Sequence, residues 1–362
     1  MLRAPVPFAA RVLRRCAVVL ATTVAVSASP SLQGQSVPPA AVRIDDTLRR
    51  EGEALVALAD ARARGERVAV DFAIDWRNDF FKARPGTFVP FTLTVPGSAL
   101  PPGPALLYVR VEAAAPVRPK RSRTPPVFAY ETIFPVVIQP AAGDGLVRVR
   151  RGFAVGPGSY KVTAVLRGSG GGGRPAGLLE RTLEVPDFWI PQLATSTIVL
   201  AERIEALSEP VAAAELDEDP YVVGSHRIHP AAGASYNRLG ELIVVFLVYN
   251  PDVTPEHHFD VQVDYHLFRE VPGTAAPSAR AAGDGPAARA GESYVTRTSP
   301  QRLNPALMGP RFDPATGAPV LAGQAIPLGS FEPGKYRLNI VVTDLLSRRT
   351  LSRDVTFSVV GS

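Results

Sequence analysis

The sequence predicts an all-β protein with two tandem Ig/fibronectin-like β-sandwich domains, preceded by a signal peptide and one short helix. Three observations lead to this fold class. From residue 66 onward, short segments rich in Val, Thr, Phe, Tyr and Leu alternate with turns that contain Pro and Gly, a pattern typical of sandwich strands. No helical segment separates successive strands, as a parallel α/β sheet would require. A Pro-Gly-x-Tyr phrase also occurs twice, each time at the start of an alternating strand.

The first 28 residues have the pattern of a signal peptide. Four arginines precede an uncharged, mostly apolar run from Cys16 to Ala28. This run is about 13 residues long, which suits a signal-peptide core and is shorter than the roughly 20 residues that span a bilayer. We therefore expect cleavage near Ala28 and a periplasmic or secreted mature chain. An uncleaved membrane anchor is the alternative.

Removing this leader changes what the charge implies. The whole chain has a formal net charge of +5, and the leader arginines supply most of it. The remaining chain has no basic stripe interleaved with aromatic residues, so we expect no nucleic-acid partner. The single cysteine, Cys16, leaves with the leader, and the mature chain therefore has no disulfide and no thiolate site. No later segment is apolar enough to be a transmembrane segment.

A spacer and a helix precede the first strand. Residues 29–43 are rich in proline and are expected to form a disordered spacer. Over 44–65, acidic residues at the start and a periodic apolar pattern predict a helix. The apolar residues are Leu48, Leu55, Val56, Leu58 and Ala59. Gly52 weakens this helix by about 1 kcal/mol, and Gly65 is a suitable stop.

The strands fall into two series. The first series predicts a β-sandwich over 66–187, with strands at 68–75, 87–95, 105–113, 127–138, 146–155, 160–166 and 178–185. Residues 188–220 are expected to form a connecting strand and an acidic linker. The second β-sandwich is predicted over 221–362, with strands at 239–250, 259–270, 293–299, 336–344 and 351–360. Residues 273–291 contain almost no large apolar side chains, so we expect a mobile loop there.

The repeated phrase predicts that one architecture is built twice. Pro157, Gly158 and Tyr160 match Pro333, Gly334 and Tyr336, and each set precedes an alternating strand. Proline and glycine would turn the chain, and the tyrosine hydroxyl would reach a backbone carbonyl, as in the tyrosine corner of Ig-like domains. Downstream, residues 179–181 match 351–353, with the extra length of the first copy placed at the glycine run 168–173. Chance recurrence of a common hairpin phrase is the alternative.

Local signatures of common catalytic and metal sites are missing. All five histidines lie in the second half, and His226 and His229 would face opposite sides of a strand. The acidic run 215–219 lacks the spacing of a calcium loop. The sequence contains no P-loop, G-x-S-x-G, S-x-x-K or H-E-x-x-H motif. We therefore expect no metal ion, no cofactor and no enzymatic activity, although a dispersed carboxylate pair in a hydrolase would leave no local motif.

Two segments suggest binding to a partner. A basic loop concentrates four positive charges in six positions: Arg118, Lys120, Arg121 and Arg123. It would meet an anionic polymer or surface, unless it is only a solvated loop. The segment 75–86 groups Trp76, Phe80 and Phe81 among charges. These rings would form a sugar platform, unless they pack a corner between strands.

Residues 66–362 resemble the tandem Ig-like β-sandwich regions of exported bacterial proteins of unassigned function. The resemblance lies in WRNDFFKA, TFVPFTLTV, PYVVG and the C-terminal PGKYRLNIVVTD. Some of those proteins also carry a von Willebrand A-type domain. This chain has no D-x-S-x-S metal motif, so the resemblance implies a fold and no functional residues.

These observations predict an exported, non-enzymatic binding or scaffolding protein that acts through loops of two β-sandwich domains. The expected partner is a protein or polysaccharide of the cell envelope. The first alternative is a carbohydrate-binding accessory module that uses Trp76 and the nearby aromatic residues. The second alternative is a hydrolase with a dispersed carboxylate pair.

Overall fold

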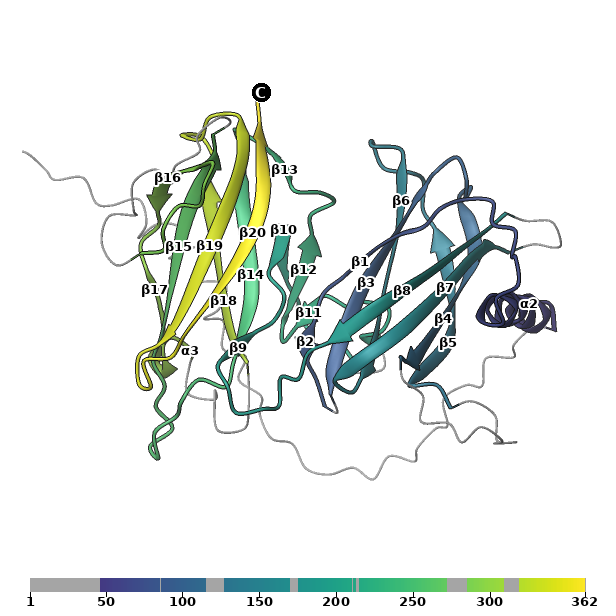
Figure 1. Ribbon diagram of the computed structural model, residues 1–362, viewed down its shortest axis with the longest axis horizontal. Helices are drawn as coiled ribbons and strands as arrows, with labels where there is room; N and C mark the ends of the chain where they lie inside the picture. The colour runs from purple at the N-terminus through teal and green to yellow at the C-terminus, as the bar shows by residue number, and fades with distance from the viewer. Residues whose placement is uncertain are drawn as a thin grey trace, which may run out of the picture. The chain divides into compact units, whose positions relative to one another are not determined.

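A computed structural model describes most of the chain after the predicted spacer. The described residues are 46–84, 86–114, 127–169, 175–209, 211–212, 215–271, 285–308 and 319–361. The predicted signal peptide and spacer lie outside them, as does the stretch 273–284 of the predicted mobile loop. The described chain forms two compact units: 46–187 with 215–220, and 188–212 with 221–361. Each unit contains a β-sandwich, called here the first and the second sandwich (Figure 1).

The first sandwich consists of two four-stranded sheets. One sheet has the order β5–β4–β7–β8, formed by β4 (Gly103–Ala113), β5 (Tyr130–Ile138), β7 (Gly158–Gly168) and β8 (Ala176–Val185). In the other, β3 pairs with β6 and with two short strands; the bounds are β1 (Asp75–Asn78), β2 (Phe81–Lys82), β3 (Thr87–Pro96) and β6 (Leu146–Val155). The strand predicted at 68–75 does not form. Phe72 makes only an isolated bridge to Gly177, and β1 begins at Asp75.

The second sandwich has two six-stranded sheets. The first has the order β11–β12–β10–β14–β18, with β9 also paired to β14; the bounds are β9 (Ala194–Thr195), β10 (Val199–Ala206), β11 (Val222–Val223), β12 (His226–Pro230), β14 (Glu241–Tyr249) and β18 (Val320–Pro327). The second has the order β13–β20–β19–β15–β16, with β17 also paired to β15; the bounds are β13 (Ser235–Asn237), β15 (Val261–Glu270), β16 (Glu292–Arg297), β17 (Gln301–Leu303), β19 (Gly334–Asp344) and β20 (Thr350–Val360). A short helix, α3 (Pro305–Met308), follows β17.

The predicted connection 188–220 is largely part of the two units. Val199, Leu200 and Ala201 of β10 are buried in the second sandwich because their side chains are apolar and β10 pairs with β14. The acidic run belongs to the first unit, where the Gly152 N–H donates to the Asp217 carbonyl at 2.8 Å. Most of the predicted connecting segment thus belongs to the second unit, and the acidic run belongs to the first.

The two sandwiches share one strand order. In each, two consecutive strands (β1 and β2, or β9 and β10) pair with one central strand (β3 or β14), and that central strand also pairs with β6 or β18. The opposite sheets run β5–β4–β7–β8 and β16–β15–β19–β20. This common order supports the repeat that the sequence predicts. The extra β11–β12 hairpin and β13 lie between β10 and β14 of the second copy.

The register of the last hairpin corrects one detail of the repeat. Tyr160 lies opposite Leu183, and Tyr336 lies opposite Phe357. Measured from the tyrosine, Leu351 corresponds to Gly177, because each lies opposite the residue six positions after its tyrosine, Val342 or Leu166. The sequence match of 179–181 with 351–353 is therefore out of register. The first hairpin is longer than the second by fewer residues than the sequence match implies.

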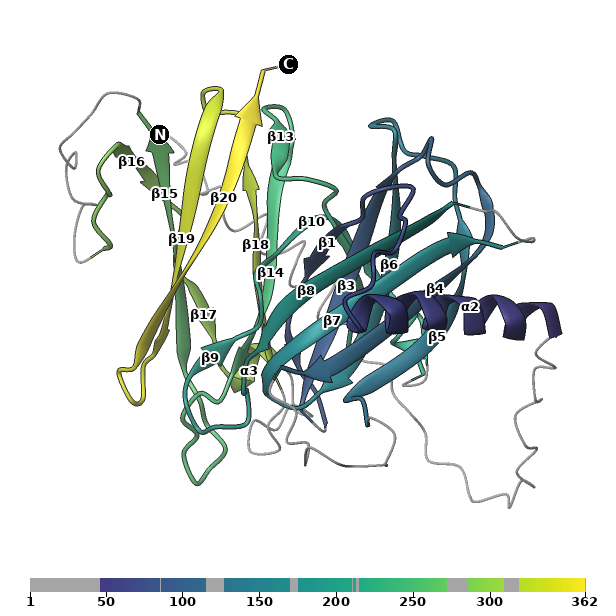
Figure 2. The same cartoon turned by 45° about the vertical axis from the view of Figure 1, so that its right-hand side comes forward.

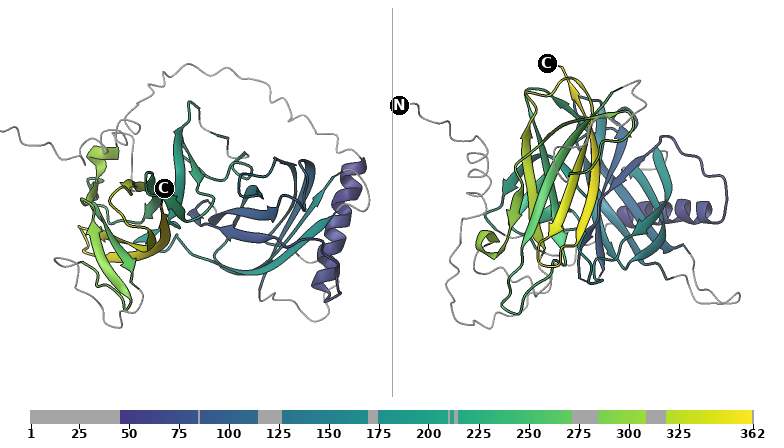
Figure 3. Two further views of the ribbon diagram at one scale, coloured as in Figure 1. Left: turned by 90° about the horizontal axis from the view of Figure 1, so that it is seen from above. Right: turned by 60° about the vertical axis from the view of Figure 1, so that its left-hand side comes forward.

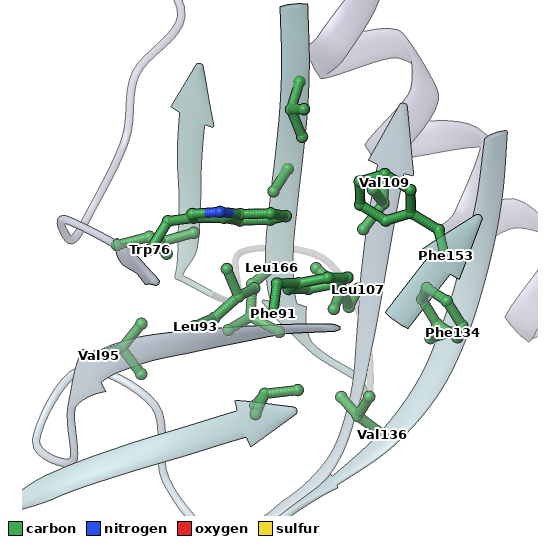
Figure 4. Close-up of a cluster of buried hydrophobic side chains, with 14 of the residues drawn as sticks. Trp76, Phe91, Leu93, Val95, Leu107, Val109, Phe134, Val136, Phe153 and Leu166 are labelled. Carbon is green, nitrogen blue, oxygen red and sulfur yellow. The ribbon is translucent and has the colours of Figure 1, made fainter. Parts of the chain in front are cut away.

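Each sandwich has its own apolar core. Alternation puts every second side chain of the central strands inside, which gives β3 and β15 their buried aliphatic and aromatic residues. In the first core, the Trp76 indole lies over Phe91 with Leu93 and Leu107 close by (Figure 4). Neither described core contains a Cys or Met side chain.

The predicted helix is present as α2 (Asp46–Ala63). It lies across the outer face of the β5–β4–β7–β8 sheet (Figures 2 and 3). Leu55 and Ala59 pack there against Leu106, Tyr108 and Val165. Among the described residues, no helix combines the length and the apolar character needed to cross a bilayer.

Candidate interaction surfaces

The aromatic group predicted from 75–86 is a packed corner. Trp76 is 6% exposed, and its ring stacks on Phe91 with centroids 4.2 Å apart. Its indole N–H donates to Asn78 Oδ1 at 3.1 Å. Phe81 is buried and Phe80 is partly buried against the same core. A sugar platform needs an exposed ring face, so of the two interpretations that the sequence left open for this segment, the structure shows the packed corner.

Arg118, Lys120, Arg121 and Arg123 lie outside the described residues. The structure therefore places no part of the predicted basic loop.

The histidines of β12 are placed as the strand pattern predicts. His226 and His229 point to opposite faces; His226 is buried, and His229 Nε2 lies 2.8 Å from Glu205 Oε2. In the acidic run, Asp217 is near Tyr130, and burial raises the pKa of Asp217 above its ordinary value. Within the described ranges, no group of three or more His, Cys, Asp or Glu side chains is arranged to hold a metal ion.

The two repeated tyrosines form matching corners. The Tyr160 hydroxyl donates to the Gly156 carbonyl at 3.0 Å, and the Tyr336 hydroxyl donates to the Glu332 carbonyl at 2.6 Å. Gly158 precedes the first tyrosine with φ of +145°, a value that L-residues rarely adopt. This confirms the predicted hydrogen bond of the tyrosine corner, whose role is structural.

One end of the second sandwich holds two loops together through a buried carboxylate. These are the β14–β15 loop, residues 250–260, and the β19–β20 loop, residues 345–349. Asp344 is fully buried, and its carboxylate accepts the backbone N–H groups of Asp252 at 2.7 Å and Leu346 at 3.0 Å. Arg349 completes the link by donating to the Asp252 carboxylate. The two loops therefore behave as one surface.

Asn250 attaches a third segment to these loops. Its Nδ2 lies within 3.1 Å of the carbonyl oxygens of Phe188, Ile190 and Gln192. Arg349 also donates to the Pro191 carbonyl at 3.3 Å. We call the combined surface, formed by residues 188–192, 250–260 and 345–349, the loop end of the second sandwich.

The backbone of the loop end contains non-glycine residues with positive φ. Only three non-glycine residues in the described part of the chain have positive φ: Asn250 at 53°, His257 at 60° and Arg348 at 60°. All three lie in these loops. Such conformations cost roughly 1–3 kcal/mol each and persist only where the surroundings determine them, which occurs preferentially at functional sites.

The loop end presents apolar and basic side chains to solvent. Leu346 is 41% exposed, Trp189 and Ile190 are similarly exposed, and Arg348, two residues after Leu346, is also exposed. The sequence predicted no binding surface here, because no single segment forms it. The signal that could have found it is the pair of Asx residues at strand ends, Asn250 and Asp344, since such residues bond to neighbouring backbone groups.

A second polar cluster lies on the outer face of β15–β19–β20. Arg337 is buried and donates to both carboxylate oxygens of Glu292, at 2.7 and 2.5 Å, and to Asp354 at 2.8 Å. Its guanidinium also lies 4.2 Å from the centroid of the Phe268 ring. The hydrogen bond from Arg337 lowers the pKa of the Glu292 carboxyl. This cluster fastens β16 to the sheet and is fully paired, so it is structural.

His266 and Asn339 are neighbours across β15 and β19 on this outer face. His266 is 3% exposed, and burial lowers its pKa below the ordinary value. His266 Nδ1 and Asn339 Oδ1 are both buried without a hydrogen-bond partner in the structure. Each orphaned atom is costly in a folded protein.

Comparison with known proteins finds no matching family model and no matching curated protein. Among solved structures, the chain is similar to an Escherichia coli alpha-2-macroglobulin activated by porcine elastase, with 10% identity and a TM-score of 0.21 over 81% of this chain and 22% of that one. It is also similar to a Salmonella alpha-2-macroglobulin reacted with methylamine, with 15% identity and a TM-score of 0.20 over 81% of this chain and 15% of that one. The chain thus spans less than a quarter of the length of these proteins. Similarity at this level assigns no functional residue.

Proposed function

We propose that this chain is an exported, non-enzymatic binding or scaffolding protein that contacts a cell-envelope partner through the loop end of the second sandwich. The observation that carries the proposal is the fixed conformation of that end. Asp344 and Asn250 hold three segments together, and the strained residues of the described chain are confined to two of them. A rigid sheet that presents loops is a common arrangement for recognition.

The composition and the rigidity of the loop end suit a protein partner. Tryptophan and arginine are enriched among residues that dominate binding, and here Trp189 and Arg348 stand beside exposed aliphatic side chains. Loops that are already ordered lose less conformational entropy on association. Binding would therefore need little rearrangement.

The proposal is tested by cross-linking in the envelope fraction. The double variant Leu346→Ser with Arg348→Glu changes the exposed side chains and leaves the backbone N–H bonds to Asp344 in place. Leu239→Ser is the matched control, because Leu239 is 83% exposed in the β13–β14 turn. We expect the cross-linked partner to be lost in the double variant and retained in the control. Retention in both, or the absence of any specific partner, would overturn the proposal.

A polysaccharide partner is the second candidate, favoured by the exposure of Trp189. With Trp76 buried, Trp189 is the tryptophan whose ring is partly accessible. A glycan array would show a signal that Trp189→Ala abolishes. No signal with the wild-type chain would favour the protein partner.

Export is part of the proposal and rests on the sequence of the first 28 residues. N-terminal sequencing of the chain recovered from the periplasm or the medium is expected to begin near residue 29. A chain that begins at Met1 and remains with the membrane would contradict it.

A further inference from the structure

Helix α2 makes a limited apolar contact with the sheet that it covers. Among the α2 residues whose burial the structure describes, only Gly52, Leu55 and Ala59 are buried, and Val56 and Leu58 are partly buried against the same sheet. They lie over an apolar patch of the outer face, formed by Leu106, Tyr108 and Val165 with the half-buried Leu178 beside them. None of the α2 residues belongs to the core between the two sheets. The sandwich core is therefore complete without α2.

Two ion pairs orient α2 on this face. Asp60 pairs with Arg110 at 2.6 Å, and Arg62 pairs with Glu180 at 2.6 Å. The face thus offers a positive group on β4 and a negative group on β8, separated by apolar side chains. This pattern selects a helix of one polarity, because a reversed helix would bring like charges together.

Both sheet charges keep a partner within the sheet when the helix is removed. Arg110 Nε also donates a hydrogen bond to the Tyr108 hydroxyl at 2.7 Å, and the Arg110 guanidinium forms an ion pair with Glu131 at 3.6 Å. Glu180 also pairs with Lys161 at 2.5 Å. A buried charge left without a partner would strongly oppose the departure of α2. That obstacle is absent here.

The connection between α2 and the sandwich permits movement of the helix. Residues 64–67 and 69–71 are exposed, and Gly65 has φ of +81°. The chain becomes anchored at Asp71, whose N–H donates to the Ala176 carbonyl at 2.9 Å and whose carboxylate accepts the Ala176 N–H at 2.7 Å. The helix is therefore tethered to the sheet by a short solvent-exposed segment.

We propose that the outer face of β4, β7 and β8 is a binding surface for an amphipathic helix of a partner protein, and that α2 is its intramolecular competitor. The partner helix carries the α2 pattern: two apolar residues four positions apart, as Leu55 and Ala59, then an acidic and a basic residue at the positions of Asp60 and Arg62. Helices with such spaced anchors commonly dock on apolar surfaces. This surface shares no residue with the loop end, so the two proposals stand or fall independently.

The test uses a labelled synthetic peptide of residues 44–65 as the partner helix and the full mature chain as the receptor. In one receptor variant, Leu55→Glu with Ala59→Glu undocks the tethered helix. We expect the peptide to bind this variant at least about tenfold more tightly than wild type, because the apparent dissociation constant scales inversely with the fraction of uncovered receptor. Fluorescence anisotropy measures the binding, and circular dichroism verifies the folded sheet.

Two controls keep the result decisive. A peptide with Leu55→Glu, and an undocked receptor with Val165→Glu, are each expected to abolish binding. If the first variant does not fold, Asp60→Lys with Arg62→Glu weakens docking without placing a charge at a buried position, and the same direction of change is expected. A folded, undocked receptor that fails to bind the peptide would overturn the proposal. Equal affinity of wild type and undocked receptor would overturn the role of α2 as competitor.

Discussion

Tyr160 and Tyr336 each close a sandwich corner through one hydrogen bond to a carbonyl four residues earlier. Tyr336→Phe keeps the ring and removes the donor to Glu332, so we expect the free energy of unfolding to fall by about 0.5–1.5 kcal/mol. Tyr160→Phe should have a similar effect. Urea denaturation measures both. Tyr294→Phe, at a half-exposed ring, is the control, and an equally large loss there would contradict the role of the corner bonds.

His266 should make stability depend on pH near neutrality. Its imidazole is buried with Asp264 and Arg297 as the neighbouring charged groups, and burial lowers its pKa. The unfolded chain therefore binds this proton at a higher pH than the folded chain does. Stability from this group is complete above about pH 6.5 and decreases as the pH falls below that value.

The variant His266→Gln is expected to flatten this part of the profile. Carboxyl groups with lowered pKa, such as Glu292 and Asp354, lose their contribution only at more acidic pH, so the two effects separate. Urea midpoints between about pH 5 and 7 measure the slope. Equal slopes for wild type and variant would show that His266 does not control it.

At the scale of elements, one buried ion pair fastens β16 to β19. Arg337→Met would leave the Glu292 carboxylate buried without its main partner, so we expect a loss of about 3–5 kcal/mol in stability. The double variant Arg337→Met with Glu292→Gln removes the uncompensated charge and should recover part of this loss. Thermal and urea unfolding of both variants check the difference. A double variant less stable than the single one would contradict the explanation.

Two glycines distinguish helix propensity from packing. A Cβ at Gly52 of α2 would meet the terminal methyl of Ile133 at 2.8 Å, and Ile133 is partly exposed and can move. Gly52→Ala should therefore gain up to about 1 kcal/mol from helix propensity. A Cβ at Gly177 of β8 would meet the buried Phe72 ring at 2.3 Å. Gly177→Ala should destabilise the first sandwich, and opposite shifts in melting temperature would confirm both expectations.

At the scale of the whole molecule, stability comes from two apolar cores without cross-links. Leu107 and Leu267 are fully buried, one in each core. Truncation of either to Ala should cost about 2–5 kcal/mol. Because Cys16 is the only cysteine of the chain, reducing agent should leave the urea midpoint of the mature protein unchanged. A midpoint that shifts with reductant would contradict this account.

The sequence predicted the fold class, the helix and the repeat because each leaves a local pattern. Alternation marks β3 and β15, and periodic apolar residues mark α2. It did not assign 188–220 to either sandwich, since two-residue pairings and the packing of Asp217 depend on partners far away in the chain. It also left two interpretations of Trp76 open, a sugar platform and a packed corner, because the residue type alone does not show whether an aromatic side chain is buried or exposed. Of the loop end, only the Asx residues carried a local signal.

The amino-acid sequence by itself determined that this protein is built from two β-sandwiches of related design. Strand alternation, turn residues and the Pro-Gly-x-Tyr phrase are properties of neighbouring residues. Only the tertiary structure decided which surfaces are available for binding. Burial of the Trp76 ring removed it from the candidate binding surfaces. Hydrogen bonds of Asp344 and Asn250 joined three distant segments into the loop end. Burial and long-range hydrogen bonds arise from the packing of the whole chain, so no short stretch of sequence encodes them.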